Sequence, residues 1–171
     1  DTAMRKFLSV LITIIGTATI ANAQNVITGE VAPDLKVKQW LMDLQPEEAD
    51  YTCIVFYHSE SPQCRRWLAR VKNLAQSTET KMNVIILTKE KYSDAGVTLT
   101  EHLGANTCVA FDDEGRSFRN YGVKFIPFCV ICNKQRIALW CGHAGGLTQH
   151  TIDKITNIKT NKKSIISKNC G

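Results

Sequence analysis

The sequence lacks several features that would place it directly in a functional class. It contains no internal repeat and no basic stripe interleaved with aromatic residues, so its net charge of +5 does not indicate nucleic-acid binding. Its four histidines match no metal-ligand spacing, and we expect neither a metal nor another cofactor. With 44% apolar and 22% charged residues, the 171-residue chain has an ordinary globular composition. The length suits one domain with a short targeting segment.

The sequence also lacks an apolar run of the roughly 20 residues that a membrane-spanning helix requires. The apolar segment that it does have, residues 7–20, follows the basic pair Arg5 and Lys6 and directly precedes Ala21-Asn22-Ala23. A basic start, an apolar stretch and an A-x-A site form the pattern of a secretory signal peptide. We therefore expect cleavage after Ala23 and no stable membrane anchor afterwards.

The predicted organisation has three parts. These are residues 1–23 with the N-terminal extra residues and the signal peptide, a domain over residues 24–158, and a basic tail over residues 159–171. The signal segment is of bacterial type, which predicts a periplasmic or otherwise exported location, and such a compartment permits disulfides. The seven cysteines are an odd number, so at least one of them is unpaired or bonded to another molecule.

One strand and the helix after it are the clearest local structures in the predicted domain. Residues 51–57 form a nearly continuous apolar and β-branched run, which is typical of a strand buried on both faces. Apolar residues recur at three- and four-residue spacing over residues 64–77, which predicts a helix with one apolar face. Ser61 is a good N-cap for this helix, and Pro62 suits its first position.

The rest of the domain alternates between shorter strands and helices. We expect a short helix around residues 37–44 and a β-hairpin formed by residues 128–132 and 137–141. The other expected elements are strands at 82–87 and 108–111 and helices at 91–104, 117–121 and 148–158. This order predicts an α/β fold in which helices flank a central mixed sheet.

Several local features occur in an order that resembles a known family. A buried strand leads into a helix with Cys64 in its first turn, and Tyr121-Gly122-Val123-Lys124-Phe125-Ile126-Pro127 comes about sixty residues later. A hairpin, a glycine-rich bend and an amphipathic helix follow. Together with the opening Gly29-Glu30-Val31-Ala32-Pro33-Asp34-Leu35, this arrangement resembles the exported thioredoxin-like and redoxin proteins related to the alkyl hydroperoxide reductase and thiol-specific antioxidant family. The resemblance covers nearly all of residues 29–158 and implies a thioredoxin-like fold.

The resemblance places the active-site motif at Ser61-Pro62-Gln63-Cys64. In the family this segment is Cys-x-x-Cys, so Ser61 stands at the first cysteine and Cys64 at the second. Pro127 falls on the family's cis-proline, which packs against the active-site helix. The partners that the resemblance implies are protein thiols or peptide segments in the periplasm.

The attacking thiol of the family's reaction cycle is therefore missing. Thiol–disulfide exchange requires thiolate attack and a mixed disulfide that a second thiol resolves, and a serine hydroxyl does not attack in this way at neutral pH. Two interpretations of Cys64 stay open: a reactive thiol activated by the helix end and by Arg65 and Arg66, or a buried and inert residue. The acidic residue that dithiol thioredoxins often bury beside the motif is replaced by Val55.

Three classes of function follow, and the sequence leaves them open. The first is a relative of thiol-disulfide oxidoreductases that acts through the single thiol of Cys64. The second is a redox-inactive binding or chaperone-like module that keeps the peptide groove beside Pro127. The third is a one-cysteine peroxidase, since Ser-x-x-Cys echoes the Thr-x-x-Cys of peroxiredoxins. Tyr57 argues against the third class, because peroxiredoxins have a proline at that position.

The hairpin suggests a disulfide between Cys129 and Cys141. In a hairpin centred on Lys134 and Gln135 these two cysteines would face each other, and the alternative is that both are small buried apolar residues. The literal Cys-x-x-Cys formed by Cys129 and Cys132 is not a candidate redox pair, because side chains three apart on a strand point to opposite faces.

Overall fold

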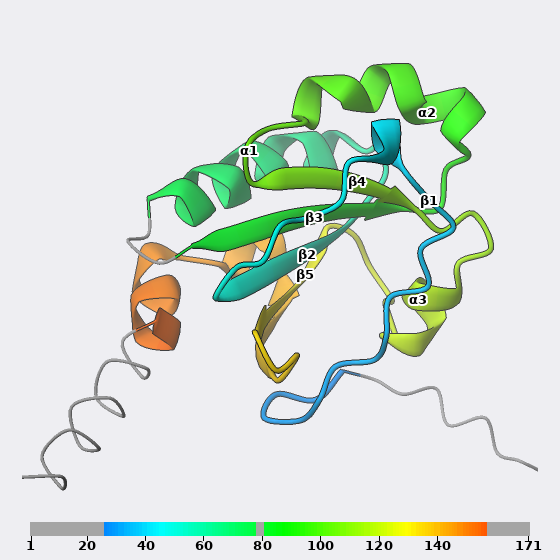
Figure 1. Ribbon diagram of the computed structural model, residues 1–171. Helices are drawn as coiled ribbons and strands as arrows, with labels where there is room; N and C mark the ends of the chain where they lie inside the picture. Colours follow the sequence, from blue (N-terminus) through cyan, green and yellow to red (C-terminus); the bar gives the residue numbers. More distant parts are fainter. Residues whose placement is uncertain (1–25, 78–80, 157–171) are drawn as a thin grey trace, which may run out of the picture.

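The computed structural model describes residues 26–77 and 81–156 of the chain (Figure 1). The expected signal peptide, the basic tail and Cys170 lie outside the described residues. Within the two described ranges, no helix combines the length and the apolar character that crossing a membrane requires. The ranges include the 61–64 motif, Pro127 and the predicted hairpin.

Six strands form one mixed sheet at the centre of the described chain (Figure 1). Their order across the sheet is β1-β4-β3-β2-β5-β6. The pairs β2–β3 and β3–β4 are parallel, whereas the other neighbouring pairs are antiparallel. The strands are β1 (Gln39–Trp40), β2 (Tyr51–Tyr57), β3 (Met82–Thr88), β4 (Thr107–Phe111), β5 (Phe128–Asn133) and β6 (Ala138–His143). The mixed sheet confirms the predicted α/β architecture.

Helices cover both faces of this sheet (Figure 1). Helix α1 and helix α2 pack on one face, and the short helix α3 packs on the other. The helices are α1 (Pro62–Gln76), α2 (Tyr92–Leu99) and α3 (Arg116–Asn120), with 3-10 turns η1 (Leu41–Asp43), η2 (Thr100–His102) and η3 (Ala144–Gly146). Residues 149–156 are also helical, as predicted for the start of the last helix.

The sheet divides the apolar core into two parts, one on each face. Along β3, the side chains of Val84 and Ile86 belong to the core under α1, and those of Ile85 and Leu87 belong to the core under α3. Alternate side chains of a strand point to opposite faces, so a strand between two helical layers must be apolar throughout. The continuous apolar runs of β2 and β3 are therefore explained by burial on both faces.

The prediction of a helix around residues 37–44 is wrong. Gln39 and Trp40 form the short edge strand β1, which pairs with Phe111 and Ala110 of β4. The chain then turns through η1, where Met42 has a φ of 54°, which is incompatible with a continued right-handed helix. Pairing with the sheet edge determines the conformation here, and local helix propensity does not.

The predicted disulfide between Cys129 and Cys141 is also wrong. Cys129 lies opposite Gly142, and Cys141 lies opposite Val130, so the two cysteines point to opposite faces of the hairpin. The strand register shifts between Ile131 and Cys132, and this bulge displaces the pairing by one residue from that of a regular hairpin. Both thiols are free in the structure.

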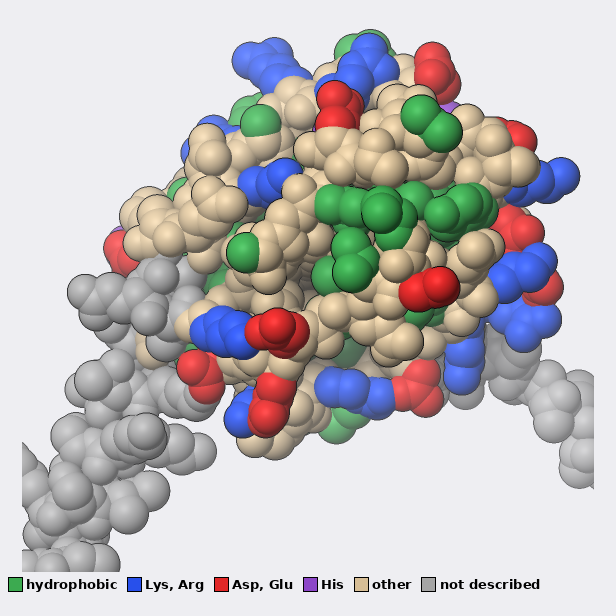
Figure 2. Space-filling view, turned by 45° about the horizontal axis from the view of Figure 1, so that its top comes forward, with side chains coloured by type: hydrophobic (Ala, Val, Ile, Leu, Met, Phe, Trp, Pro, Cys, Tyr) green, Lys and Arg blue, Asp and Glu red, His purple; other side chains and the backbone are tan. Residues whose placement is uncertain are grey.

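Charged side chains of both signs are scattered over the face of the molecule that Figure 2 shows. Apolar side chains gather near the middle of this face, and the described residues drawn there form no continuous basic surface. The positive net charge is therefore not concentrated on this face.

Candidate functional site

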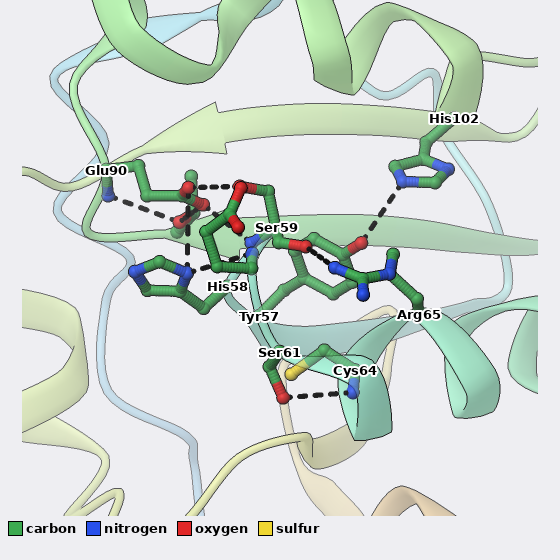
Figure 3. Close-up of polar contacts among 10 residues, drawn as sticks. Tyr57, His58, Ser59, Ser61, Cys64, Arg65, Glu90 and His102 are labelled. Carbon is green, nitrogen blue, oxygen red and sulfur yellow. Dashed lines mark hydrogen bonds and ion pairs between the residues drawn. The ribbon is translucent and has the colours of Figure 1, made fainter.

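Helix α1 begins at the predicted motif, and its first turn is capped as the sequence indicates. The Cys64 backbone N–H donates a hydrogen bond to Ser61 Oγ at 3.2 Å, and Pro62 occupies the first helical position. Ser61 is partly exposed, whereas Pro62 and Gln63 are exposed. The residue that would carry the attacking thiol in a dithiol motif is therefore the accessible helix cap, and it carries a hydroxyl (Figure 3).

The Cys64 side chain points into the core between α1 and the sheet. Its exposed fraction is 0%, and it belongs to the same apolar cluster as Cys53 and Cys129, which are also fully buried. Interaction with the Cys53 thiol, together with burial, raises the pKa of Cys129 well above its ordinary value. The raised pKa keeps the Cys129 thiol protonated near pH 7, and full burial keeps Cys64 out of reach of a partner disulfide.

The loop between β2 and α1 is held by a carboxylate from the segment that follows β3 (Figure 3). Glu90, just after β3, accepts the Ser59 backbone N–H at 2.9 Å and also the Ser59 hydroxyl. The Thr88 hydroxyl donates to the same carboxylate at 2.7 Å. On the opposite side, Arg65 of α1 donates to the Ser59 carbonyl at 2.6 Å. Ser59 is thus fixed through its N–H, its hydroxyl and its carbonyl, and the loop that carries Ser61 is fixed with it.

The Glu90 carboxylate is kept ionised by this network. Partial burial alone would raise its pKa, but the hydrogen bonds from Ser59 and Thr88 and the nearby His58 ring lower the pKa below 4.5. His58 Nδ1 lies 3.6 Å from the carboxylate and also accepts the Glu60 backbone N–H. His58 therefore stabilises the loop and has no contact with Cys64 that the structure records.

A second polar link joins β2 to η2. The Tyr57 hydroxyl lies 3.2 Å from His102 Nε2, and Lys72 of α1 donates to the His102 carbonyl at 2.9 Å. Burial raises the pKa of Tyr57 to about 12, and burial lowers the pKa of His102 below 6.5. Both groups are therefore neutral near pH 7. Tyr57 stands where peroxiredoxins have proline, and here its hydroxyl contacts His102.

The segment with Pro127 lies at the same end of the sheet as the motif loop. Phe56 pairs with Phe128, so the residues after β2 and those before β5 leave the sheet together. The Ile126–Pro127 peptide bond is cis, and the Pro127 carbonyl accepts the Ala144 backbone N–H at 3.0 Å. The register therefore brings the predicted Ser61 and Pro127 segments to one edge of the molecule.

An aromatic row, formed by Trp67 of α1, His143 of β6 and Phe125 before Pro127, crosses this edge. The ring centroids of Trp67 and His143 are 6.2 Å apart, and those of His143 and Phe125 are 6.0 Å apart. Phe125 is 49% exposed, although its ring also contacts Phe128. The row offers partly exposed aromatic surface beside Pro127, which suits contact with another chain.

Gly145 leaves room for Trp67 and His143 to contact each other. A Cβ atom on Gly145 would lie 3.0 Å from Trp67 Cζ2 and 3.0 Å from His143 Nδ1, which is tighter than most contacts of a Cβ atom, so the two rings would have to shift. The Gly145 backbone N–H donates to His143 Nδ1 at 2.9 Å and so fixes the imidazole ring. On the outer side, the guanidinium carbons of Arg66 and Arg70 each lie 5.4 Å from the Trp67 ring centroid.

Sequence reasoning missed the residues that shape this site most. Glu90 and Ser59 are 31 positions apart, and no local pattern links them. The Trp67–His143 contact likewise joins α1 to the glycine-rich bend, where only the glycines were a signal. Among the described residues, no group of three His, Cys, Asp or Glu side chains could hold a metal ion.

No family model matches the chain, and no curated protein matches its sequence. Solved structures do match. Peroxidoxin BcpB from Mycobacterium tuberculosis has a TM-score of 0.59 and 13% identity, covering 77% of this chain and 94% of that one. A thiol-disulfide isomerase from Corynebacterium glutamicum has a TM-score of 0.55 and 15% identity, covering 67% and 86%.

Coverage differs between matches. A thioredoxin-like protein from Bacteroides caccae, with a TM-score of 0.48 and 18% identity, aligns over 66% of this chain but 41% of its own, so this chain spans less than half of that protein. At these identities the likeness concerns the fold alone. The chain has a thioredoxin-like fold, as the sequence resemblance implied.

Proposed function

We propose that this protein is an exported thioredoxin-fold binding module, which holds an extended segment of a partner protein against the aromatic row, beside the buried Pro127. In this proposal the Ser61-to-Cys64 motif performs no disulfide exchange. The observation that carries the proposal is the contrast between an accessible Ser61 and a Cys64 that is 0% exposed. In this proposal the accessible surface beside the motif binds the partner, and the buried thiol takes no part.

The geometry of the aromatic row supports binding of a peptide. Aromatic side chains supply large contact areas at low conformational-entropy cost, and they are enriched at the residues that dominate binding energies. Phe125 is half exposed and already braced by Phe128 and His143, so little ordering is needed when a partner binds. The export part of the proposal rests on the predicted signal peptide.

The second candidate function is exchange through the single thiol of Cys64. One observation favours it: Cys64 lies in the first turn of α1, where the helix end stabilises a thiolate. The Cys64 thiolate would attack a sulfur of a partner disulfide, forming one S–S bond and releasing the other partner sulfur as a thiolate. Because Cys64 is buried, the loop between β2 and α1, which Glu90 and Arg65 hold at Ser59, must open before this reaction. Peroxide reduction would require the same opening.

Peptide selection from a displayed library tests the proposal. We expect the wild-type protein to enrich peptides, the Phe125→Ala variant to lose most of that enrichment, and the Cys64→Ala variant to keep it. Circular dichroism of each variant verifies folding. Loss of binding in Cys64→Ala together with a trapped mixed disulfide in the wild type would instead establish the single-thiol function.

A further inference from the structure

A hollow next to the aromatic row is lined by both loops of the site. It has a volume of about 240 Å³ and lies between Tyr57 and His58 at the end of β2, Lys89 after β3, and residues 123–126 before Pro127. Phe125 belongs both to this wall and to the aromatic row, so the hollow continues the proposed binding surface. A side chain of a segment bound along Pro127 could enter it.

The side chains of the hollow that can carry a positive charge are Lys89, Lys124 and His58, and among the described residues no carboxylate lines it. Lys89, Lys124 and His58 stand around apolar walls that include Phe118, and the Lys89 ammonium lies 5.1 Å from the Phe118 ring centroid. Within the described residues, neither lysine has an acidic group within ion-pair distance. The two ammonium groups therefore remain available to an outside anion.

The nearest acidic groups are already engaged. The Glu90 carboxylate faces His58, but it accepts hydrogen bonds from Ser59 and Thr88. Asp113, in the adjoining hollow, is paired with Lys38 at 2.9 Å, and Glu114 is paired with Arg116. The local field in the hollow is thus positive, because Lys89 and Lys124 outnumber the Glu90 carboxylate, while Asp113 and Glu114 are each paired with a cation.

Resting on the proposed function, we infer that this hollow receives an Asp or Glu side chain of the bound segment, beside an apolar residue that packs on Phe125. Lysine ammonium groups act as point charges and not as bidentate forks, so the hollow selects negative charge and does not distinguish Asp from Glu by geometry. Phe118 and the apolar atoms of the wall accept the methylene groups of such a side chain.

The expected effect is moderate because both lysines are exposed. Replacing the acidic residue of a bound peptide by its amide should weaken binding roughly five-fold at low salt, the upper range for an exposed ion pair. The difference should shrink as salt is raised, since the Debye length falls to about 3 Å at 1 M ionic strength.

The test compares peptides selected by three proteins from one displayed random library. Wild type and Lys154→Glu, a control on the helix of residues 149–156, should enrich peptides with Asp or Glu. The double variant Lys89→Glu and Lys124→Glu should enrich peptides with Lys or Arg instead. A selected peptide and its amide version are then compared by fluorescence anisotropy at low and high salt.

The outcomes separate this inference from the proposed function. Enrichment without acidic preference, or an unchanged preference in the double variant, overturns the inference and leaves the proposed function standing. Absence of any enrichment by the folded wild type overturns both. Acidic peptides that bind the double variant five-fold more weakly, while Lys154→Glu binds as the wild type does, support the inference.

Discussion

The two sides of the candidate site differ in what they expose. On the thiol side, Cys64 is fully buried, and the loop before it is fixed by Glu90 and Arg65. On the aromatic side, Phe125 is half exposed beside Pro127. The thiol side is closed and hydrogen-bonded, and the aromatic side is open and apolar. The difference teaches that one edge of the fold can bury its cysteine and still leave an aromatic surface exposed.

The largest expected effect comes from removing the Glu90 carboxylate, which holds the loop on the thiol side. Glu90→Ala removes the acceptor of the Ser59 N–H, the Ser59 hydroxyl and the Thr88 hydroxyl, and Ser59 and Thr88 are buried. Leaving such donors unsatisfied should lower the free energy of unfolding by about 2–3 kcal/mol, measured by urea denaturation. The exposed Glu48, paired with Lys134, offers a control, and Glu48→Ala should leave stability unchanged. Equal stability of the two variants would contradict the role of Glu90.

The next effect concerns packing in the aromatic row. Gly145→Ala places a Cβ atom 3.0 Å from both Trp67 and His143 and should destabilise the protein by about 1–3 kcal/mol, as overpacking does. Gly104→Ala is the matched control, since its Cβ would meet nothing closer than 4.0 Å. Thermal unfolding of the two variants measures the difference. If both behave alike, the row is not closely packed at Gly145.

A smaller effect is expected on the open side. Phe125→Ala should reduce the affinity for a selected peptide roughly ten-fold, because truncating an aromatic residue that dominates an interface costs more than 1 kcal/mol. Val97→Ala changes an apolar side chain that is 88% exposed on α2 and should leave the affinity unchanged. Anisotropy titrations provide both values. An unaffected Phe125→Ala variant would remove the aromatic row from the binding surface.

The smallest effect is a pH dependence of stability. Since the folded-state pKa of Glu90 is below 4.5, its ionised form stabilises the fold above that pH, and this contribution is lost as the pH falls through the folded-state value. Glu90→Gln should therefore lose less stability than wild type between pH 5 and about pH 3. Denaturant titrations at each pH show this as a flatter curve, and parallel curves would contradict it.

Local sequence patterns predicted the structural features that depend on neighbouring residues alone. The cap at Ser61, the start of α1 at Pro62 and the buried strand β2 all follow from neighbouring residues. The edge strand β1 was not predictable, because it forms only through pairing with β4. The hairpin bulge was not predictable either, since a single unpaired residue changes which side chains face each other.

The candidate site was likewise predictable in part. The order of local motifs singled out Ser61, Cys64 and Pro127, and the strand register brings their segments to one edge. The burial of Cys64 is a tertiary property, and the motif alone was compatible with a reactive or an inert thiol. The hydrogen bonds from Ser59 to Glu90 join two distant chain segments, and no periodic sequence pattern predicts them.

The rate at which iodoacetamide alkylates Cys64 tests the central claim most directly. Mass spectrometry at this residue gives the rate in the native protein and in guanidinium, and the partly exposed Cys141 is the internal reference. The closed thiol side predicts that native Cys64 reacts at least roughly a hundred-fold more slowly than unfolded Cys64, because reaction requires local opening, while Cys141 is labelled in the native state. Native labelling of Cys64 within a few-fold of the unfolded rate would contradict the claim and restore the single-thiol function.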